Sequence, residues 1–380
     1  MTRSTPSSAR CYVEISRRQL AANYNAVRRT VGPDVDVMGV VKAEAYGHGM
    51  VEVARVLEAH GARWLAVSTV AEGAALRAAG LKAEILVMAG LLAPDPAVAI
   101  AQRLTPVAHS LEDIAAFDKA SLAAGQPLPF HLKLDTGMAR LGTRATPAAI
   151  AHALAGLRSA RCEGLLTHFA SASDFTTPQT TLQIECFDEL TGALAELGVR
   201  PKYLHLSSTN AIAYARPHAW RTIVRPGHAI YGYVSPAKGN GPPSDLAVAP
   251  ALSWKAKIVA VKDVPANTLV GYGGTACTRR ATRMAILGAG YADGIPHRLS
   301  NRGRVIAGGK FAPILGTVSM DLTTIDITDS AKLSPGDDVT LLGTEGRLSI
   351  NAQEMARVAG TISYNVLCGI KPRVERVYID

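Results

Sequence analysis

The stretch DVDVMGVVKAEAYGHGMVEVARVLEA (34–59) begins with a run of β-branched and apolar residues and continues with apolar residues at helical spacing. The first part predicts a buried strand at 35–41, and the second part predicts an amphipathic helix at 50–59. A buried strand followed by a helix is one βα unit of a parallel sheet. The fold therefore depends on how often this unit recurs.

The same alternation continues along the chain. Strands are predicted at 35–41, 64–68, 85–88, 104–108, 130–134, 164–169, 203–206 and 222–224. Helical patterns lie between them, for example at 111–124 and 182–197, and another precedes the first strand at 17–30. Eight parallel strands with helices in about 200 residues predict an α/β fold, a (β/α)8 TIM-type barrel with its active site at the carboxyl ends of the strands.

The pattern of apolar and polar residues changes after the linker SPAKGNGPPSD (235–245). Short alternating strands with glycine turns follow, and the only convincing helix is 352–359, which begins after Asn351. We therefore expect a flexible tail at 1–10, the barrel at 11–240 and a mainly β C-terminal domain at 241–380. The segment 11–15 has no place in the barrel and is free to add a strand to the second domain.

Composition excludes several classes of protein. The 380 residues are 48% hydrophobic, which fits a globular chain with two cores. The five cysteines are odd in number and form no C-x-x-C pair, which argues against a disulfide framework, a zinc site or another metal centre. The net charge is +9, but its lysines and arginines are scattered, so an anionic small ligand explains it better than nucleic acid.

Two features argue against a membrane protein. The longest apolar stretch, 85–93, is far shorter than the ~18 residues of a membrane helix. The first ten residues, MTRSTPSSAR, contain no apolar core of a secretion signal. We therefore expect a cytoplasmic protein.

Polar residues cluster where the predicted barrel strands end. Lys42, Lys133, His168, His205 and Arg225 all occupy such positions, where a barrel core has no need of them. A lysine in this place could simply be solvated. An amine crowded against an apolar strand end, however, loses hydration, and its lowered pKa makes it a nucleophile toward an aldehyde. After the last strand, backbone N–H groups of the turn 226–228 could cradle an oxyanion.

Eight segments together resemble, in order, the blocks of the alanine racemase family, whose enzymes use pyridoxal 5′-phosphate. They are VVKAEAYGHG (40–49), HLKLDTGMARLG (131–142), THFA (167–170), VRPGHAIYG (224–232), VGYGG (270–274), GYADG (290–294), SMD (319–321) and TISYNV (361–366). One such block would be weak evidence, but eight in the same order over nearly the whole chain are highly specific.

The resemblance implies a two-base racemase, because a single base on one face would return the proton that it removed. Lys42 would hold the cofactor as a Schiff base and serve one face, and Tyr272 would serve the other. Arg225 would face the pyridine nitrogen, and because a guanidinium keeps its protons, the ring stays a weak electron sink and transamination is discouraged. His168 would link Tyr272 to Arg225 and extend the positive field that a tyrosine base needs.

The resemblance also assigns the remaining ligand contacts. The cofactor and its phosphate would be bound by Tyr46, His168, Ser208, Thr209, Arg225, Gly227, His228 and Tyr364. Arg140 would bind the substrate carboxylate beside Met320, Lys133 would be a candidate for carbamylation, and Tyr291 and Asp321 would line the entrance. Tyr272 and Met320 would come from a partner subunit, which implies a homodimer.

The sequence departs from the family pattern at two positions. Ser208-Thr209 replaces the usual Asn-Ser, which keeps a hydroxyl but puts finer details of the pocket in doubt. Ser319 stands where cysteine is common before Met-Asp, and we expect little effect on mechanism.

The resemblance favours interconversion of L- and D-alanine, with D-alanine supplied for peptidoglycan, over several alternatives. A serine or broader-specificity racemase shares the same blocks, and a biosynthetic and a catabolic role are equally compatible with them. A related decarboxylase would pair the pyridine nitrogen with a carboxylate instead of Arg225. A non-catalytic single-barrel protein would leave the second domain unexplained. The glycines of GAGYADG (288–294) miss the spacing of a dinucleotide site.

Overall fold

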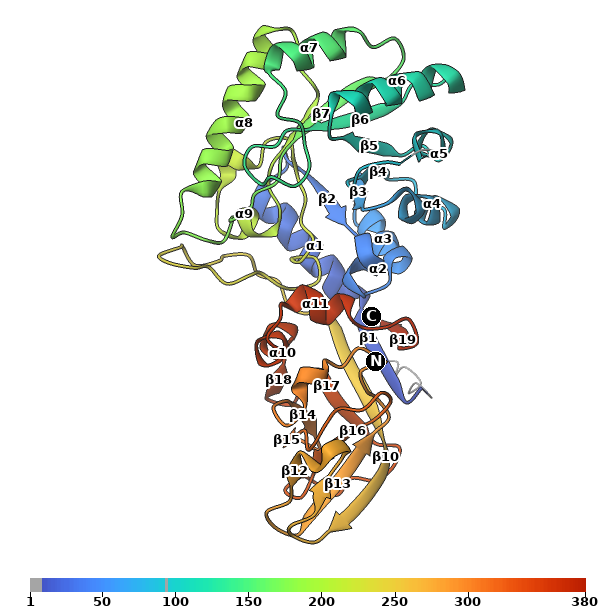
Figure 1. Cartoon of the computed structure of the whole chain (residues 1–380), viewed down its shortest axis with the longest axis vertical. Coiled ribbons are helices and arrows are strands. Elements are labelled where there is room, and N and C mark those ends of the chain that lie inside the picture. The colour runs from blue at the N-terminus through green and yellow to red at the C-terminus, as the bar shows by residue number, and fades with distance from the viewer. Residues whose placement is uncertain (1–8, 93–94) are drawn as a thin grey trace. The chain divides into compact units, whose positions relative to one another are not determined.

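A computed structural model describes residues 9–92 and 95–380, which form two compact units (Figure 1). The barrel unit comprises Leu20–Ala45 and Met50–Ala249, and the β unit comprises 9–19, Tyr46–Gly49 and Pro250–Asp380. Residues 1–8 of the expected flexible tail lie outside the described residues. Arg10, at the end of that segment, is tied to the β unit, because its carbonyl accepts a 2.8 Å hydrogen bond from Lys257 N.

The barrel unit contains an eight-stranded sheet whose neighbouring strands all run parallel, in the order β8-β7-β6-β5-β4-β3-β2-β9. Its strands are β2 (Asp36–Val40), β3 (Trp64–Val67), β4 (Glu84–Val87), β5 (Thr105–Ala108), β6 (Pro129–Lys133), β7 (Arg161–Leu166), β8 (Tyr203–His205) and β9 (Ile223–Val224). A parallel bridge between Ser208 and Arg225 joins the two ends of this order. The predicted TIM-type barrel is confirmed.

Helices follow the strands around the sheet (Figure 1). They are α1 (Arg17–Val31), α3 (Met50–Ala59), α4 (Val70–Ala78), α5 (Asp95–Ala101), α6 (Leu111–Ala124), α7 (Pro147–Ala155), α8 (Gln179–Glu196) and α9 (Thr209–Ala213). Local chemistry sets their ends: Thr69 and Glu72 form a capping box on α4, and Gly125 ends α6 in the left-handed conformation. Helix α8 begins before the predicted residue 182, because its polar first turn does not contribute to the apolar period.

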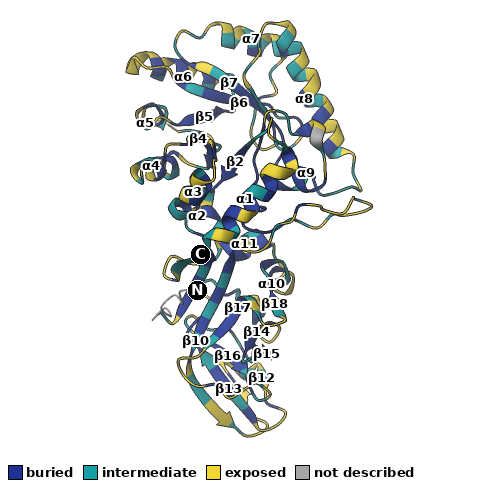
Figure 2. Ribbon diagram, turned by 180° about the vertical axis from the view of Figure 1, so that it is seen from behind, coloured by how far each residue is buried: buried dark blue, intermediate teal, exposed yellow. Residues whose placement is uncertain are grey.

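The barrel interior is partly polar. The ring of Phe130 packs 5.7 Å from that of Phe117 in α6, so Phe130 faces the helices. Because side chains alternate along a strand, His131 and Lys133 face the interior. His131 and His205 are both fully buried, and much of the barrel sheet is dark in Figure 2.

A left-handed turn follows strand β2 in the short helix α2 (Lys42–Tyr46). Ala43, Glu44, Ala45 and Tyr46 all have φ between 52° and 55°, although none is glycine. Each L-residue in this conformation costs roughly 1–2 kcal/mol. The carboxylate of Glu72 stabilises the turn by accepting a 2.7 Å hydrogen bond from Ala43 N.

The β unit is built around a nine-stranded mixed sheet, with a separate hairpin of β11 (Leu269–Val270) and β12 (Ala276–Cys277). The sheet contains β1 (Cys11–Ser16), β10 (Leu252–Val264), β13 (Thr282–Leu287), β14 (Arg304–Ala307), β15 (Lys310–Pro313), β16 (Thr323–Asp326), β17 (Asp338–Glu345), β18 (Leu348–Ile350) and β19 (Glu375–Ile379). Strand β1 lies within it, antiparallel to β10 and parallel to β19.

Two helices accompany this sheet, α10 (Ala352–Ala359) and α11 (Ser363–Cys368). The expectation of a single convincing helix is wrong, because the structure also contains α11. This helix could not be predicted because it is too short to produce a helical period. Short 3-10 turns lie at η1 (Pro217–Ala219), η2 (Tyr272–Gly274) and η3 (His297–Leu299). None of the helices in the described part of the chain combines the length and apolar character that a membrane crossing requires.

Candidate active site

Four cations gather at the carboxyl ends of the barrel strands. Lys42 follows β2, Lys133 ends β6, Arg140 lies in the loop after β6 and Arg225 follows β9. Burial, followed by the positive charges of Arg140 and Arg225, lowers the pKa of Lys133 to about 8. The charge of Lys42 adds to the same effect, so these groups share one electrostatic environment.

Arg225 is buried at the centre of this group, with 4% of its surface exposed. Its guanidinium donates to the carbonyl oxygens of His205 (2.9 Å), Thr167 (2.7 Å) and Leu206 (3.1 Å). No carboxylate of the described chain forms an ion pair with it. Burial lowers the pKa of Arg225 to about 10, so the group still carries its charge near pH 7 and acts only as a donor.

The Nδ1 atom of His168 lies 3.4 Å from the second terminal nitrogen of Arg225. Burial, and next the charge of Arg225, lowers the pKa of His168 to about 3, so its ring is neutral. Because Arg225 donates to Nδ1, the ring hydrogen resides on Nε2. His168 therefore offers a donor on its other side.

The loop that carries His168 is fixed by Gln183 of helix α8. The amide of Gln183 donates to His168 O (3.0 Å), and its oxygen accepts from Ala170 N (2.9 Å). Its side chain also approaches Thr136 Oγ1, at 3.4 Å. Gln183 could not be predicted from the sequence, because a glutamine within a helix carries no signal of such a role.

The turn after β9 lies against the first residue of α9. Thr209 Oγ1 accepts from Gly227 N at 3.3 Å and from Ala229 N at 3.1 Å. Ser208 forms the bridge to Arg225, and the ring of His228 stacks on Tyr233 at 5.1 Å. Two of the expected phosphate residues of the barrel unit, Thr209 and Gly227, are thus in direct contact, and Ser208 and His228 are their neighbours in sequence.

Two of the predicted tyrosines pack together in the β unit. The rings of Tyr46 and Tyr364 lie 5.9 Å apart, and burial raises the pKa of Tyr46 above its usual value. Tyr46 follows the barrel lysine in sequence but belongs to the β unit. The structure therefore groups Tyr46 with Tyr364, which lies in helix α11.

Other predicted residues of the β unit are exposed within this chain. Tyr272 is 75% exposed and Met320 is 54% exposed. Tyr272 lies in η2, where Gly271 and Gly273 both have φ of 71°, so the turn depends on glycine at these positions. Thr317 supports it by donating from Oγ1 to Tyr272 O (3.2 Å).

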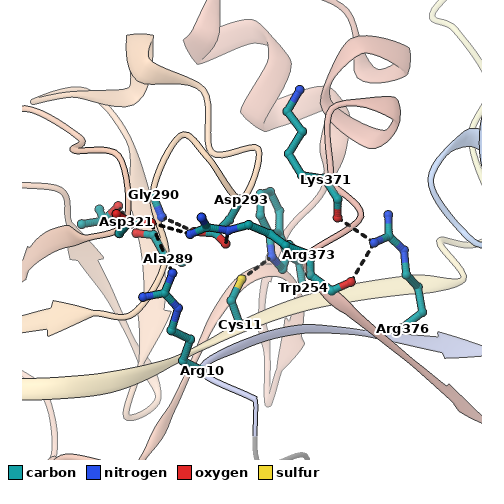
Figure 3. Close-up of polar contacts among 12 residues, drawn as sticks. Arg10, Cys11, Trp254, Ala289, Gly290, Asp293, Asp321, Lys371, Arg373 and Arg376 are labelled. Carbon is teal, nitrogen blue, oxygen red and sulfur yellow. Dashed lines mark hydrogen bonds and ion pairs between the residues drawn. The ribbon is translucent and has the colours of Figure 1, made fainter.

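An ion-pair network joins the segments that carry Tyr291 and Asp321 (Figure 3). The buried carboxylate of Asp293 accepts from Arg373 Nε at 2.6 Å and from Gly290 N at 2.8 Å. Arg373 also reaches Asp321 at 2.6 Å, and Arg10 approaches the same carboxylate at 3.3 Å.

Backbone hydrogen bonds complete this junction. Tyr291 N donates to Ser319 O (3.0 Å), and Ala292 N donates to Met320 O (2.9 Å), so the two segments lie side by side. Arg373 could not be predicted from the sequence, because it lies 80 residues from Asp293.

The donor set fits pyridoxal phosphate. Lys42 provides an amine, Arg225 provides a buried donor without a paired carboxylate, and the cluster at Thr209 provides hydroxyl and N–H groups for an anion. A (β/α)8 barrel with this lysine, followed by a β domain, defines the class of barrel-containing pyridoxal-phosphate enzymes.

The chain belongs to the alanine racemase family, whose enzymes are isomerases. Residues 15–236 match the family described as "Alanine racemase, N-terminal domain", and residues 251–378 match "Alanine racemase, C-terminal domain". An alanine racemase of Syntrophobacter fumaroxidans is 38% identical over 363 residues, covering 95% of this chain and 96% of its own length.

Solved structures agree with this assignment. The alanine racemase from D-cycloserine-producing Streptomyces lavendulae has a TM-score of 0.91 at 34% identity, with 99% of this chain and 98% of that chain covered. The enzyme from Bacillus anthracis, with bound L-Ala-P, has a TM-score of 0.90 at 31% identity, covering 99% of this chain and 96% of its own. The enzyme from Bartonella henselae, with covalently bound pyridoxal phosphate, has a TM-score of 0.86 at 27% identity, covering 98% and 100%.

Proposed function

We propose that this protein interconverts L-alanine and D-alanine by a two-base mechanism, with pyridoxal phosphate bound to Lys42. The observation that carries the proposal is the buried guanidinium of Arg225, which has no carboxylate partner among the described residues and donates toward a neutral His168. A decarboxylase of the related fold would place a carboxylate in this position. Arg225 therefore favours racemisation over that alternative.

The cofactor, when bound, withdraws electrons from the substrate and makes its Cα proton acidic. Lys42 removes or returns that proton on one face. Tyr272 of a second subunit does so on the other, so the two residues exchange roles between the two directions of the reaction. Arg225 would hold the pyridine nitrogen as a donor that keeps its own proton, which limits transamination. His168 presents its Nε2–H toward the tyrosine and orients the phenol oxygen.

The remaining contacts hold the two ligands in place. Arg140 pairs with the substrate carboxylate, with Met320 beside it, and Tyr291 and Asp321 line the entrance. The phosphate would be held by Tyr46, Ser208, Thr209, Gly227, His228 and Tyr364. The hydroxyl of Thr209, which accepts from Gly227 N and Ala229 N, would donate its own hydrogen to the phosphate. Thr209 can do this because it retains the hydroxyl that the family pattern has there.

We infer a homodimer in which each subunit provides Tyr272 and Met320 to its partner. The high exposure of both side chains within one chain supports this, because a large aromatic and a methionine are expected to be covered when they function. Sedimentation should give a dimer, and mixing Lys42→Ala with Tyr272→Phe protein should regain activity in the heterodimer. No regain in a proven heterodimer would contradict sharing of the site.

Lys133 is proposed to carry a carbamate formed from carbon dioxide, with release of a proton. With a pKa of about 8, about a quarter of Lys133 is neutral at pH 7.5, against about one part in a thousand for an ordinary lysine. The product is an anion that attracts Arg140 where the ammonium repelled it. Labelled bicarbonate should give a carbamate carbon resonance that Lys133→Gln lacks, and its presence in the variant would refute the assignment.

An activity screen tests the substrate. The purified enzyme with cofactor is incubated with L-alanine, L-serine and larger L-amino acids, and the D-enantiomers are separated by chiral chromatography. Alanine should give the highest kcat/KM. A higher kcat/KM for serine would identify serine as the preferred substrate in place of alanine. Release of carbon dioxide without any racemisation would show that the enzyme is a decarboxylase and would overturn the proposed reaction.

We place this activity in the cytoplasm, where D-alanine would be supplied for peptidoglycan. The cysteines support a reducing compartment, since no disulfide joins any of the five, all of which lie in the described part of the chain.

A further inference from the structure

A pair of histidines lies behind Arg225 in the barrel interior. Arg225 donates to Nδ1 of His205 over 2.8 Å, and Nε2 of His205 lies 2.8 Å from Nδ1 of His131. Both imidazoles are fully buried. The result is a continuous chain of three side chains, one from the residue that follows β9 and two from strands β8 and β6.

The arginine decides where each ring hydrogen resides. A guanidinium can only donate, so Nδ1 of His205 must accept. A neutral His205 then carries its hydrogen on Nε2 and donates it to Nδ1 of His131, which in turn carries its own hydrogen on Nε2. Burial, and next the charge of Arg225, lowers the pKa of His131 to about 3 and depresses that of His205, so both rings remain neutral.

The environment of His131 holds this ring in place. Its centroid lies 5.5 Å from that of Trp64 and 5.6 Å from that of Tyr203. A Cβ atom at Gly164, the neighbouring position on strand β7, would lie 2.7 Å from Nδ1 of His131. Glycine at position 164 therefore leaves room for the imidazole.

Packing alone does not explain a histidine at this position. The Nε2 atom of His131 has no hydrogen-bond partner among the described residues. A buried donor without a partner is destabilising, and an apolar ring of similar size would avoid that penalty. The acceptor at Nδ1 is therefore the feature that distinguishes histidine from phenylalanine here.

We propose that His131 is a positioning residue, which accepts the hydrogen bond from Nε2–H of His205, holds that ring in place and thereby orients the guanidinium of Arg225. This inference rests on the proposed function, in which Arg225 donates to the cofactor ring. Its direct readout, the tautomers of two histidines, does not depend on turnover.

The test uses the holoenzyme labelled with ¹⁵N-histidine. NMR should show both His131 and His205 as neutral rings with hydrogen on Nε2, identified by the signals lost in variants at each position. In His131→Phe, the Nε2 hydrogen of His205 loses its acceptor, so its NMR signal should move upfield, the absorption band of the bound cofactor should shift, and kcat should fall about tenfold with KM changed less than twofold. His131→Asn places an amide oxygen where Nδ1 lay, and should retain kcat within about threefold.

Substitution of Gly164 provides an independent test of the role of His131. Gly164→Ala displaces the imidazole and should reproduce the His131→Phe spectrum and kcat. Gly73→Ala is the matched control, because its added Cβ meets only the end of the Leu104 side chain, at 2.8 Å, and kcat should be unchanged. If His131→Phe fails to fold, Gly164→Ala and His131→Asn decide the question.

Three results would overturn the proposal: hydrogen on Nδ1 of His205 in the holoenzyme, an unchanged Nε2–H signal of His205 when the imidazole is removed or displaced, or equal losses of kcat in His131→Phe and His131→Asn. Correct tautomers in an enzyme without racemase activity would instead contradict the proposed function and leave the hydrogen-bond chain established.

Discussion

The guanidinium of Arg225 lies between two neutral imidazoles, and its closest approach to Nδ1 of His168 is 3.4 Å. The other imidazole, His205, accepts at 2.8 Å. A buried cation is thus held by neutral acceptors, and its field is not cancelled by an adjacent carboxylate. This arrangement makes Arg225 the residue on which the choice of reaction depends.

Replacing Arg225 should change the reaction as well as its rate. Arg225→Glu should lower kcat for racemisation at least ~100-fold, since a donor to the reacting system is replaced by an acid. Release of pyruvate from alanine should increase because a carboxylic acid at this position strengthens the electron sink. Chiral chromatography and a pyruvate assay measure the two products. Arg225→Lys is the charge-conserving control and should show no increase in pyruvate, so an equal increase there would contradict the explanation.

The buried histidines predict a pH dependence of stability. His131 and His168 have pKa values of about 3 in the folded protein against about 6.5 when unfolded, so the unfolded state binds more protons between these values. The stabilisation that comes from burying these two rings in their neutral form is fully present above pH 6.5. It is lost as pH falls toward 3. His131→Phe should reduce the slope of unfolding free energy against pH by about 1.4 kcal/mol per unit near pH 5. Urea titrations at several pH values measure it, and an unchanged slope would exclude a neutral His131.

The left-handed turn after Lys42 predicts that a glycine at position 43 stabilises the folded protein. Ala43 is exposed and has φ of 53°, so Ala43→Gly should raise the unfolding free energy by about 0.5–1 kcal/mol. The matched control is Ala71→Gly in helix α4, also exposed, which should lower it by about 1 kcal/mol. Chemical denaturation compares the pair. If both glycines destabilise equally, the turn is not strained.

The network at Asp293 predicts unequal effects of two similar deletions. Asp293→Ala removes a carboxylate whose side chain is only 3% exposed and leaves Gly290 N without its acceptor, so it should lower the unfolding free energy by about 2 kcal/mol. Asp329→Ala breaks an exposed pair with Arg280 and should leave the unfolding midpoint unchanged. Equal effects would show that the Asp293 network contributes no more than a surface ion pair.

The sequence predicted the residues that depend on strand and helix periods. Lys42, Lys133 and Arg225 could be assigned to strand ends because each follows a recognisable apolar run, and parallel strands bring such ends together. The barrel and the order of its strands followed from the same counting. The matching family blocks then connected these positions to a known chemistry.

Other features depend on pairing between distant residues and could not be predicted. A period of two places His131 on the interior face, but it does not show that His205, 74 residues away, is its partner. The left-handed turn contains no glycine that would signal it, since Ala43 to Tyr46 are ordinary helix formers held by Glu72. Arg373 has no local signal either, because its role depends on Asp293 from another segment.

The central claim is that Lys42 and Tyr272 act on opposite faces of the substrate, and exchange of the Cα proton in deuterated water tests it most directly. Tyr272→Phe protein is incubated separately with L-alanine and D-alanine, and Cα deuterium is followed by mass spectrometry with chiral separation. We predict that one enantiomer exchanges without inversion at a rate near that of the unmodified enzyme, while exchange of the other falls at least ~100-fold. Equal exchange of both enantiomers at unreduced rates would contradict it, because Tyr272 would then not be the second base.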